Sequence, residues 1–560
     1  MARSKVTSRL MPDVNLPRNE FDRSHFINLN FPLGMILPVM AEFIPAGSKG
    51  RVNRSQLVRM NAVNTAAFPR LDIHMDFYMV PIKKLWSRWN NFYLNVNDED
   101  SSALYPNLSS LGVPSTAPFC QSSDLMNSIF QTGGSRNDEL GYPMLNGAQR
   151  LWDLLQYNDG NIAGRSYDMS LNTLRLQCYQ YLYYKYYRNT AYESDNPFAY
   201  NCDYLYSRAE SVGQYSQSEA TLLNYVHYVN YRKDYFTNIF PALNYVVSNP
   251  SGNNWFLPSS VVGASGLFFG GASSSAAVSP SGTTQSVNLQ FSTNGSNTIV
   301  GTVQQVRAAF ALDKLLRASA YAPKRVKDQY KARFGIDVKE NSSDYLGSKK
   351  MDVLISEVTS TASTDLDGLG AVGGRAVNFS SKDGDDIVFH NEGKTDCILM
   401  CLQYVMVRSV YDSLRVDSFN FKFSREDYFQ PEFMDLGLRP ITRLEMFMPN
   451  TGEGTVQNYI LGYVPRGVEY KLAVDRNHGL FRVGSQLAVF TNHTNVAGRT
   501  NAAGSSGVTL AFFKTKPSDI DSIMVVAYDA SSQLSDQFFS QIEFKLVVRQ
   551  NMSVHGVPRL

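Results

Sequence analysis

Residues 71–82 read LDIHMDFYMVPI, and apolar and polar side chains alternate, with interruptions, along this run. Alternation with a period of two predicts a β-strand, because successive side chains of a strand point to opposite faces of a sheet. Near the other end of the chain, residues 522–528 (SIMVVAY) and 537–549 (QFFSQIEFKLVVR) are rich in aromatic and β-branched residues, which favour strands. We therefore predict that both ends of the chain supply the outer strands of one β architecture.

The composition of the chain is low in charge and high in aromatic residues. Charged residues make up 18% of the 560 residues, against about 25% in a typical soluble protein. The 32 tyrosines and 33 phenylalanines dominate an aromatic share of 12%, and tyrosine is enriched at interfaces because it combines apolar contact with a polar tip. The net charge of +2 excludes a strongly basic nucleic-acid-binding protein, whose affinity for phosphates needs a concentrated positive surface. Such a chain is suited to protein contacts.

No targeting segment is recognisable in the sequence. The N-terminal segment is too polar for a signal peptide, and the most continuous apolar run, 397–407, is too short to span a bilayer. The five cysteines are odd in number and scattered, which argues against a disulfide framework and for a reducing compartment. We expect a soluble chain without membrane insertion.

The middle of the chain, about 96–380, contains long tyrosine-rich and Gly/Ser-rich stretches, whereas strand patterns fall mainly in 21–95 and 380–560. Two helices are predicted within this middle region, at 171–189 and 302–320, because apolar residues recur there at steps of three and four. The middle therefore consists of partly helical insertions between strands.

Positive charge gathers in two segments. Residues 1–20 form a basic N-terminal arm, in which Asp13 is the acidic residue among the first eighteen. The segment 314–333 faces either nucleic acid or solvent, and the sequence favours neither. The candidate DNA-facing residues are Arg3, Lys5, Arg9, Arg18, Lys324, Arg325, Lys327 and Lys331.

Residues 263–298 are low in charge and dense in Gly, Ser and Ala. A structureless linker is one interpretation of this composition. However, Phe268, Phe269, Leu289 and Phe291 interrupt the segment, and a pure linker does not need such side chains. We favour a projecting loop or hairpin that becomes ordered against neighbouring copies of the chain.

No catalytic, cofactor-binding or metal-binding site is predicted. Residues 390–396 (HNEGKTD) end like a phosphate-binding loop, but Val388 stands where that motif needs its first Gly, and a strand-like run follows in place of a helix. Cys397 and Cys401 have no second pair of Cys or His at finger-like spacing, so we interpret them as small buried residues.

Asp22, Ser24 and His25 place an acid, a hydroxyl and an imidazole within four residues, ahead of a long apolar run. They could begin a hydrolase site, since catalytic triads are recognised by geometry and not by order. No local signature elsewhere supplies partners for them. We interpret them as polar and capping contacts at the entry to the first strand.

Seven blocks in one order, spread over almost the whole chain, carry a family resemblance. They are 19–47 (NEFDRSHFINLNFPLGMILPVMAEFIPAG), 76–92 (DFYMVPIKKLWSRWNNF), 181–189 (YLYYKYYRN), 307–320 (RAAFALDKLLRASA) with the following KARFG, 423–437 (FSREDYFQPEFMDLG), 462–482 (GYVPRGVEYKLAVDRNHGLFR) and 549–560 (RQNMSVHGVPRL). Together they resemble the major capsid proteins of the Microviridae, the small tailless phages with single-stranded DNA, and in particular the gokushovirus-like branch.

The resemblance implies a mainly β fold, an eight-stranded antiparallel jelly roll of the viral capsid type with long, partly helical insertions. A single jelly-roll domain would span 21–560 and follow the arm 1–20. The resemblance also implies a non-enzymatic protein of the virion, assembled in the bacterial host cytoplasm as a T=1 shell of sixty copies. In the gokushovirus-like branch a projection stands on the threefold axes, and 263–298 is our candidate for it and for receptor contact.

The partners implied are further copies of the chain, the single-stranded DNA genome, a small basic DNA-packaging protein, pilot or spike-type minor proteins and a host receptor. Sixty copies at +2 carry only about 120 positive charges, far fewer than the phosphates of a genome of thousands of nucleotides. A separate basic protein is therefore required. Two alternatives remain open at this point, a jelly-roll carbohydrate-binding protein and a phage-encoded hydrolase.

Overall fold

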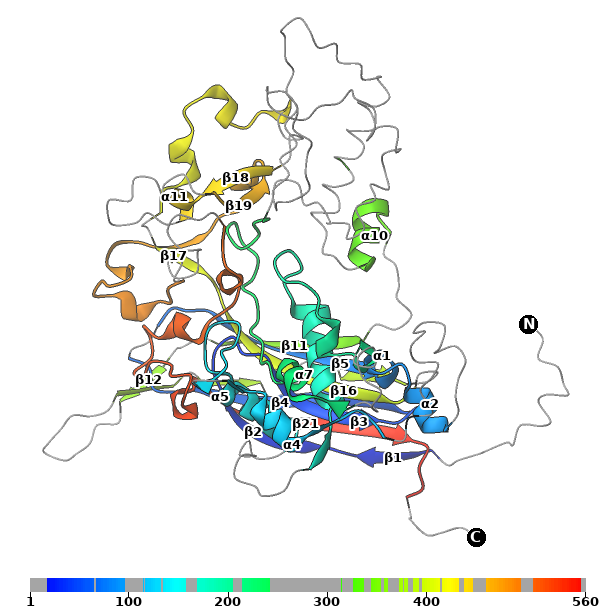
Figure 1. Ribbon diagram of the computed structural model, residues 1–560. Helices are drawn as coiled ribbons and strands as arrows, with labels where there is room; N and C mark the ends of the chain where they lie inside the picture. The colour runs from blue at the N-terminus through cyan, green and yellow to red at the C-terminus, as the bar shows by residue number, and fades with distance from the viewer. Residues whose placement is uncertain are drawn as a thin grey trace, which may run out of the picture.

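The computed structural model describes residues 18–64, 67–95, 114, 116–131, 134–157, 169–204, 214–241, 314, 326–336, 344–353, 357–360, 372–375, 377–380, 386–391, 395–412, 415–432, 438–446, 460–494 and 507–554. Two antiparallel sheets dominate these residues, together with a helical layer and a separate distal part (Figure 1). The expectation of a mainly β fold is therefore confirmed.

The first sheet has the strand order β1-β21-β4-β14, with β2 also paired to β21 and β15 also paired to β4. All of these pairings are antiparallel. Its strands are β1 (Asn19–Asp22), β2 (His25–Phe31), β4 (Lys49–Met60), β14 (Val377–Ser380), β15 (Ile387–His390) and β21 (Phe538–Gln550).

The second sheet has the strand order β11-β5-β16-β3, and its pairings are also antiparallel. Its strands are β3 (Leu37–Ile44), β5 (Leu71–Pro81), β11 (Tyr345–Val353) and β16 (Cys397–Val407).

The two sheets pack face to face around a shared apolar core. Residues at alternate positions of β21, among them Ile542 and Phe544, belong to the same buried cluster as Met75 and Phe77 of β5. The rings of Phe77 and Phe544 meet edge to face, with centroids 6.4 Å apart. The intervening positions of β21 are mostly exposed, so the first sheet keeps a bare outer face.

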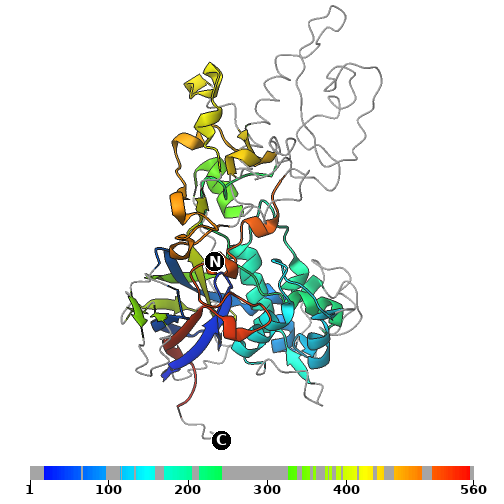
Figure 2. The same ribbon diagram turned by 90° about the vertical axis from the view of Figure 1, so that its left-hand side faces the viewer.

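The second sheet is buried on both faces. Ten of the eleven side chains of β16 are buried, as the apolar run 397–407 requires. Ile398, Met400 and Leu402 point away from the first sheet and pack in one cluster with Cys178 and Leu182 of α6 (Leu174–Leu182). Figure 2 shows the resulting layers, with the sheets on one side and the helices on the other.

The remaining elements are short and belong to the insertions between the sheet strands. The helices are α1 (Ile82–Leu85), α2 (Trp89–Leu94), α4 (Ser122–Asn127), α5 (Met144–Leu154), α7 (Gln217–Leu223), α10 (Val326–Phe334) and α11 (Arg443–Met446). The short strands are β6 (Phe119–Gln121), β7 (Phe130–Gln131), β8 (Gly134–Ser135), β9 (Ser170–Asn172), β10 (Gln214–Tyr215), β12 (Glu357–Ser360), β13 (Val372–Arg375), β17 (Val410–Asp412), β18 (Leu438–Thr442), β19 (Ile460–Pro465) and β20 (Asp475–Asn477).

A separate apolar cluster holds the distal part of the molecule together. Phe236, Tyr411, Ile441 and Val464 are among its buried members. We call the described residues 235–241, 410–494 and 507–513 the distal body. It lies above the sheets in Figure 1, where β17, β18 and α11 are labelled.

The strands predicted at 71–82 and 537–549 are confirmed as β5 and β21. The strand predicted at 522–528 is wrong, since this segment is irregular and forms one bridge, between Met524 and Val63. Its apolar residues reflect burial, because Ile523 and Met524 lie in a core cluster while Val525 and Val526 are each 52% exposed.

The helix predicted at 171–189 is confirmed in part. Leu171 belongs to β9, and the helix begins at Leu174 and continues as a π-helix from Tyr183 to Tyr187. The helix predicted at 302–320 lies outside the described residues except at Lys314. Strand β11 lies within the range that the sequence assigned to insertions and was not predicted.

Candidate functional site

The segment 417–432 of the distal body is shaped by side chains that bond to their own backbone. Asp417 accepts a hydrogen bond from the backbone N–H of Phe419 (3.1 Å), at the start of the short 3-10 helix Ser418–Phe421. Asp427 accepts from the N–H groups of Phe423 (3.0 Å) and Ser424 (2.8 Å), and these donors lower the pKa of Asp427. Such local bonds are typical of caps and turns and fix the path of the chain.

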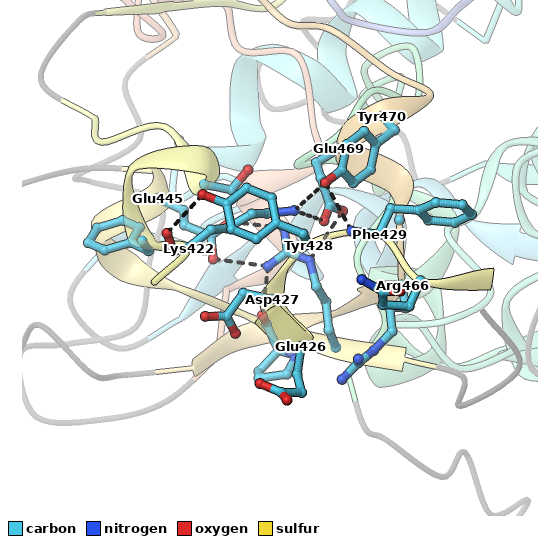
Figure 3. Close-up of a pocket in the computed structure, with 15 residues that line it drawn as sticks. Lys422, Glu426, Asp427, Tyr428, Phe429, Glu445, Arg466, Glu469 and Tyr470 are labelled. Atoms are coloured by element: carbon cyan, nitrogen blue, oxygen red, sulfur yellow. Dashed lines mark hydrogen bonds and ion pairs between the residues drawn. The ribbon is translucent and has the colours of Figure 1, made fainter. Parts of the chain in front are cut away.

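This segment borders a cavity of about 250 Å³ against β18, α11 and residues 466–470. Figure 3 shows Lys422, Glu469 and Tyr470 converging on it from two segments of the chain. The cavity is the candidate site.

The floor of the cavity is a closed network of charges. Lys422 donates from Nζ to Glu469 Oε1 (2.9 Å) and to the hydroxyl of Tyr470 (3.1 Å). Arg439 pairs with Glu445 Oε1 (3.2 Å) and with Glu469 Oε2 (3.4 Å). Two cations thus face two carboxylates, and the floor is electrically balanced.

The network shifts the pKa values of its members. Burial disfavours the ammonium of Lys422, but its hydrogen bonds to Glu469 and Tyr470 outweigh burial and raise its pKa. Burial would raise the pKa of Glu469, but the hydrogen bond from Lys422, a backbone hydrogen bond and the charges of Arg439 and Lys422 together outweigh burial and lower that pKa. Both shifts favour the charged forms, so neither group is poised to exchange protons near neutral pH.

Aromatic rings are held over this floor. The Nζ atom of Lys422 lies 4.7 Å from the ring centroid of Phe419 and 4.5 Å from that of Tyr470, within cation–π range. The backbone N–H of Phe429 donates to the Tyr470 hydroxyl (3.2 Å). The ring of Tyr428, which lines the same cavity, is 50% exposed. The site therefore offers fixed aromatic faces for contact, above a floor in which Lys422 is paired with Glu469 and Arg439 with Glu445.

Asp22, Ser24 and His25 form a turn between β1 and β2. Asp22 accepts from the N–H of Ser24 (2.9 Å) and from its hydroxyl, whose oxygen in turn accepts from the N–H of Leu546 in β21 (3.2 Å). The side-chain bond from Ser24 lowers the pKa of Asp22. His25 bonds through Nδ1 to the carbonyl of Arg23. The interpretation of these residues as structural contacts at the first strand is confirmed.

The five cysteines are free and buried, and Cys397 and Cys401 belong to the core between the sheets. Their interpretation as small buried residues is confirmed. Within the part of the chain that the structure describes, no group of three His, Cys, Asp or Glu side chains could hold a metal ion. In the same residues, no helix is both long and apolar enough to cross a membrane.

The candidate DNA-facing residues are described only in part. Arg18 lies at the end of β1, where its Nε donates to Asn551 Oδ1 (3.0 Å). Lys331 is exposed in α10, which lies above the sheets in Figure 1. The structure does not bring these two together. Lys327 also belongs to α10, and the candidates outside the described residues are Arg3, Lys5, Arg9, Lys324 and Arg325.

The candidate projection residues Phe268, Phe269, Leu289 and Phe291 also lie outside the described residues.

Comparison with known proteins assigns the chain to a family. The family model described as capsid protein (F protein) matches residues 10–123 and 144–560. This chain belongs to the capsid protein (F protein) family. The capsid protein VP1 of Chlamydia phage 1 is 21% identical to it over 545 residues, which cover 84% of this chain and 85% of that protein. The resemblance to Microviridae capsid proteins is thereby confirmed.

Membership of this capsid protein family points to a structural and not an enzymatic role. It agrees with the charge network of the candidate site, in which Lys422 and Arg439 are paired with Glu445 and Glu469. In this capsid protein the sequence blocks 423–437 and 462–482 meet, since the backbone N–H of Phe429 in the first block donates to the Tyr470 hydroxyl in the second (3.2 Å).

The residues of the cavity were missed by the sequence analysis. Lys422, Arg439 and Glu469 lie in three separate segments, and no spacing relates them. A signal was present in the aromatic residues Phe419, Phe423 and Phe429, which crowd a short polar stretch. Such crowding without strand or helix periodicity indicates a contact surface.

Proposed function

We propose that this chain is the major capsid protein of a small tailless phage of the Microviridae, and that sixty copies form a T=1 icosahedral shell around a single-stranded DNA genome. The observation that carries the proposal is the family match, which extends over residues 10–123 and 144–560. The low charge and aromatic richness of the chain support it, because buried subunit contacts disfavour Lys and Glu.

The order of the strands supports an eight-stranded jelly roll for this domain, which we propose spans 21–560 after the arm 1–20. Counting β1 with β2 and β14 with β15, since each pair shares one neighbouring strand, leaves eight strand positions. The first position pairs with the last, β2 with β21, and the fourth with the fifth, β5 with β11. The second and third pair with the seventh and sixth, which is the nesting of a folded-over hairpin.

Packaging of the genome would require partner proteins in addition to the shell. The net charge of +2 for each copy cannot neutralise a phage genome, so a small basic packaging protein would supply the remaining charge. The basic arm and parts of 314–333 would contribute to the inner surface. Minor proteins of pilot or spike type and a host receptor would complete the set, with assembly in the bacterial cytoplasm and residence in the virion.

Size-exclusion chromatography of the purified chain, followed by electron cryomicroscopy of the largest species, tests the shell. We expect particles of megadalton mass with icosahedral symmetry. A stable monomer near 63 kDa, obtained with the phage's other structural proteins present, would contradict the proposal. The same reconstruction tests the inner surface. If the arm and residues 314–333 both lie outside the shell, their proposed contribution to the inner surface is wrong.

We propose residues 263–298 as a surface projection that contacts the host receptor. Its low charge and its four large apolar residues suit the packing of three copies about an axis. Deleting residues 270–284 is expected to leave shell formation intact and to lower adsorption to the host at least about tenfold. Normal adsorption and infectivity of intact shells that carry the deletion would exclude the receptor role.

A further inference from the structure

Two exposed segments of the distal body carry opposite charge. Residues 423–432 contain Glu426, Asp427 and Glu432 against one cation, Arg425, and their net charge is −2. Residues 471–483 contain three cations against one acid and have a net charge of +2, with His478 neutral. The three cations are Lys471, Arg476 and Arg482.

Each segment also exposes large apolar side chains. In the acidic segment, Phe423 is 86% exposed, while Tyr428 and Phe429 are about half exposed. In the basic segment, Leu480 and Val483 are 55% and 59% exposed. Exposed apolar groups that are rimmed by charge are typical of protein–protein contact sites.

The acidic segment 423–432 and the basic segment 471–483 form no ion pair with one another among the described residues. In both views of the molecule the yellow segment 417–432 lies farther from the sheets than the orange segment 471–494 (Figures 1 and 2). Among the described residues, one ion pair joins these two parts, between Arg476 and Asp417 (3.9 Å), and none joins Glu426 or Glu432 to a cation or joins Lys471 or Arg482 to a carboxylate. Their charges are therefore available to another molecule.

The conformation of the acidic segment is fixed by hydrogen bonds within the subunit. Asp427 is fixed by backbone donors, and the backbone N–H of Phe429 donates to the Tyr470 hydroxyl (3.2 Å), which ties the segment to residues 466–470. The floor below is internally neutral, so the segment presents apolar faces and a fixed acidic edge. A prefixed surface loses little conformational entropy on binding.

We propose that the acidic segment 423–432 of one copy docks on the basic segment 471–483 of a neighbouring copy. This inference rests on the proposed shell, because it names one of the contacts that would build it. The charges of −2 and +2 are complementary, and apolar side chains on both segments would be covered together. Since the two surfaces differ, the contact is head-to-tail, and repetition about a rotation axis closes it into a ring.

Charge reversal with rescue tests the contact in the full-length chain. One double variant combines Glu426→Lys with Glu432→Lys, and the other combines Lys471→Glu with Arg482→Glu. Each double variant places like charges on both surfaces. We expect each pair to lower the assembled fraction at least about tenfold, and the four changes together to restore it to within about twofold of the unchanged chain. Asp427 is left unchanged because it caps the segment.

A matched control separates contact from net charge. It combines Glu426→Lys and Glu432→Lys with Lys545→Glu and Arg549→Glu, two exposed cations of β21. This variant has the same total charge as the four-change variant, and we expect it to remain unassembled. Circular dichroism and thermal melting of the unassembled fractions establish that every variant is folded.

The outcomes separate this inference from the proposed function. If the unchanged chain forms no shell, the proposed function itself fails. If the shell forms normally with either reversed pair, or if the control variant assembles as well as the four-change variant, the inference is overturned and the shell proposal stands. Folded four-change subunits that remain unassembled would also overturn it, and would indicate an occupant other than a second copy.

Discussion

Replacing Lys514 with Met is expected to lower the free energy of unfolding by about 3–5 kcal/mol. The side chain of Lys514 is completely buried and donates from Nζ to the carbonyl of Tyr228 (3.1 Å) and to the hydroxyl of Tyr183. Its Nζ lies 3.5 Å from Glu139 Oε1 and 3.9 Å from Glu193 Oε2. Methionine keeps most of the volume but leaves the carboxylates of Glu139 and Glu193, which are only 12% and 13% exposed, without this cation.

The same substitution is expected to change how stability depends on pH. Burial alone would raise the pKa of Glu139, but the charge of Lys514 and the bond from His227 outweigh burial and lower it to about 2. Because the folded-state pKa is depressed below 4.5, this group stabilises the fold above that pH and the contribution is lost as the pH falls towards 2. In Lys514→Met the loss of stability over this acid range is expected to be smaller.

Urea unfolding of dissociated subunits, followed by intrinsic fluorescence between pH 2 and pH 7, measures both effects. Lys545→Met serves as the control, because Lys545 is exposed on β21 and its removal is expected to cost less than about 0.5 kcal/mol. Adding Glu139→Gln to Lys514→Met is expected to recover part of the loss. A loss below about 1 kcal/mol for Lys514→Met alone would contradict the buried-pair account.

Gly34→Ala is expected to destabilise the subunit by about 3–5 kcal/mol, of which about 1–2 kcal/mol is backbone strain and the rest steric overlap. Gly34 has φ +81°, a conformation that favours glycine, and a Cβ atom there would lie 2.3 Å from the carbonyl oxygen of Thr515. A backbone oxygen cannot move aside as a side chain does. Gly34 also bonds through its N–H to Val405 and through its carbonyl to Val229, so the overlap would disturb three segments.

Gly141→Ala is the matched control for this substitution. Gly141 has a similar φ of +87°, but no atom of the described residues lies within 4 Å of the added Cβ. The control therefore isolates the backbone strain, and thermal melting of both variants measures the difference. Equal destabilisation by the two substitutions would show that the approach of Thr515 does not matter.

The outer strands were predictable because their side chains follow the geometry of one buried face. In β21 the alternation of apolar and polar residues marks the core and the bare face directly. In β16 a continuous apolar run marks a strand buried on both faces. Residues 522–528 show the limit of this reasoning, because apolar content alone does not distinguish a strand from a buried irregular segment.

The candidate site was not predictable from spacing. Lys422 meets Glu469 because the turns of 417–432 and the short 3-10 helix Val468–Tyr470 are packed together, and this depends on the whole distal body. The family blocks that contain or border these residues were recognised, but a block says nothing about which other block it contacts. The DNA-facing and receptor-contact residues stay predictions.

The position of β21 has a consequence for synthesis. It is the last of the described sheet strands, yet it lies between β2 and β4, which come among the first. Until residues 538–550 leave the ribosome, the first sheet lacks its central strand and β2 has no paired neighbour in the described part of the chain. Pairing at such a sequence separation forms late. A chain that lacks β21 would thus leave β2 without its described partner and one edge of β4 unpaired, so the synthesis of β21 acts as a checkpoint before a subunit can join others.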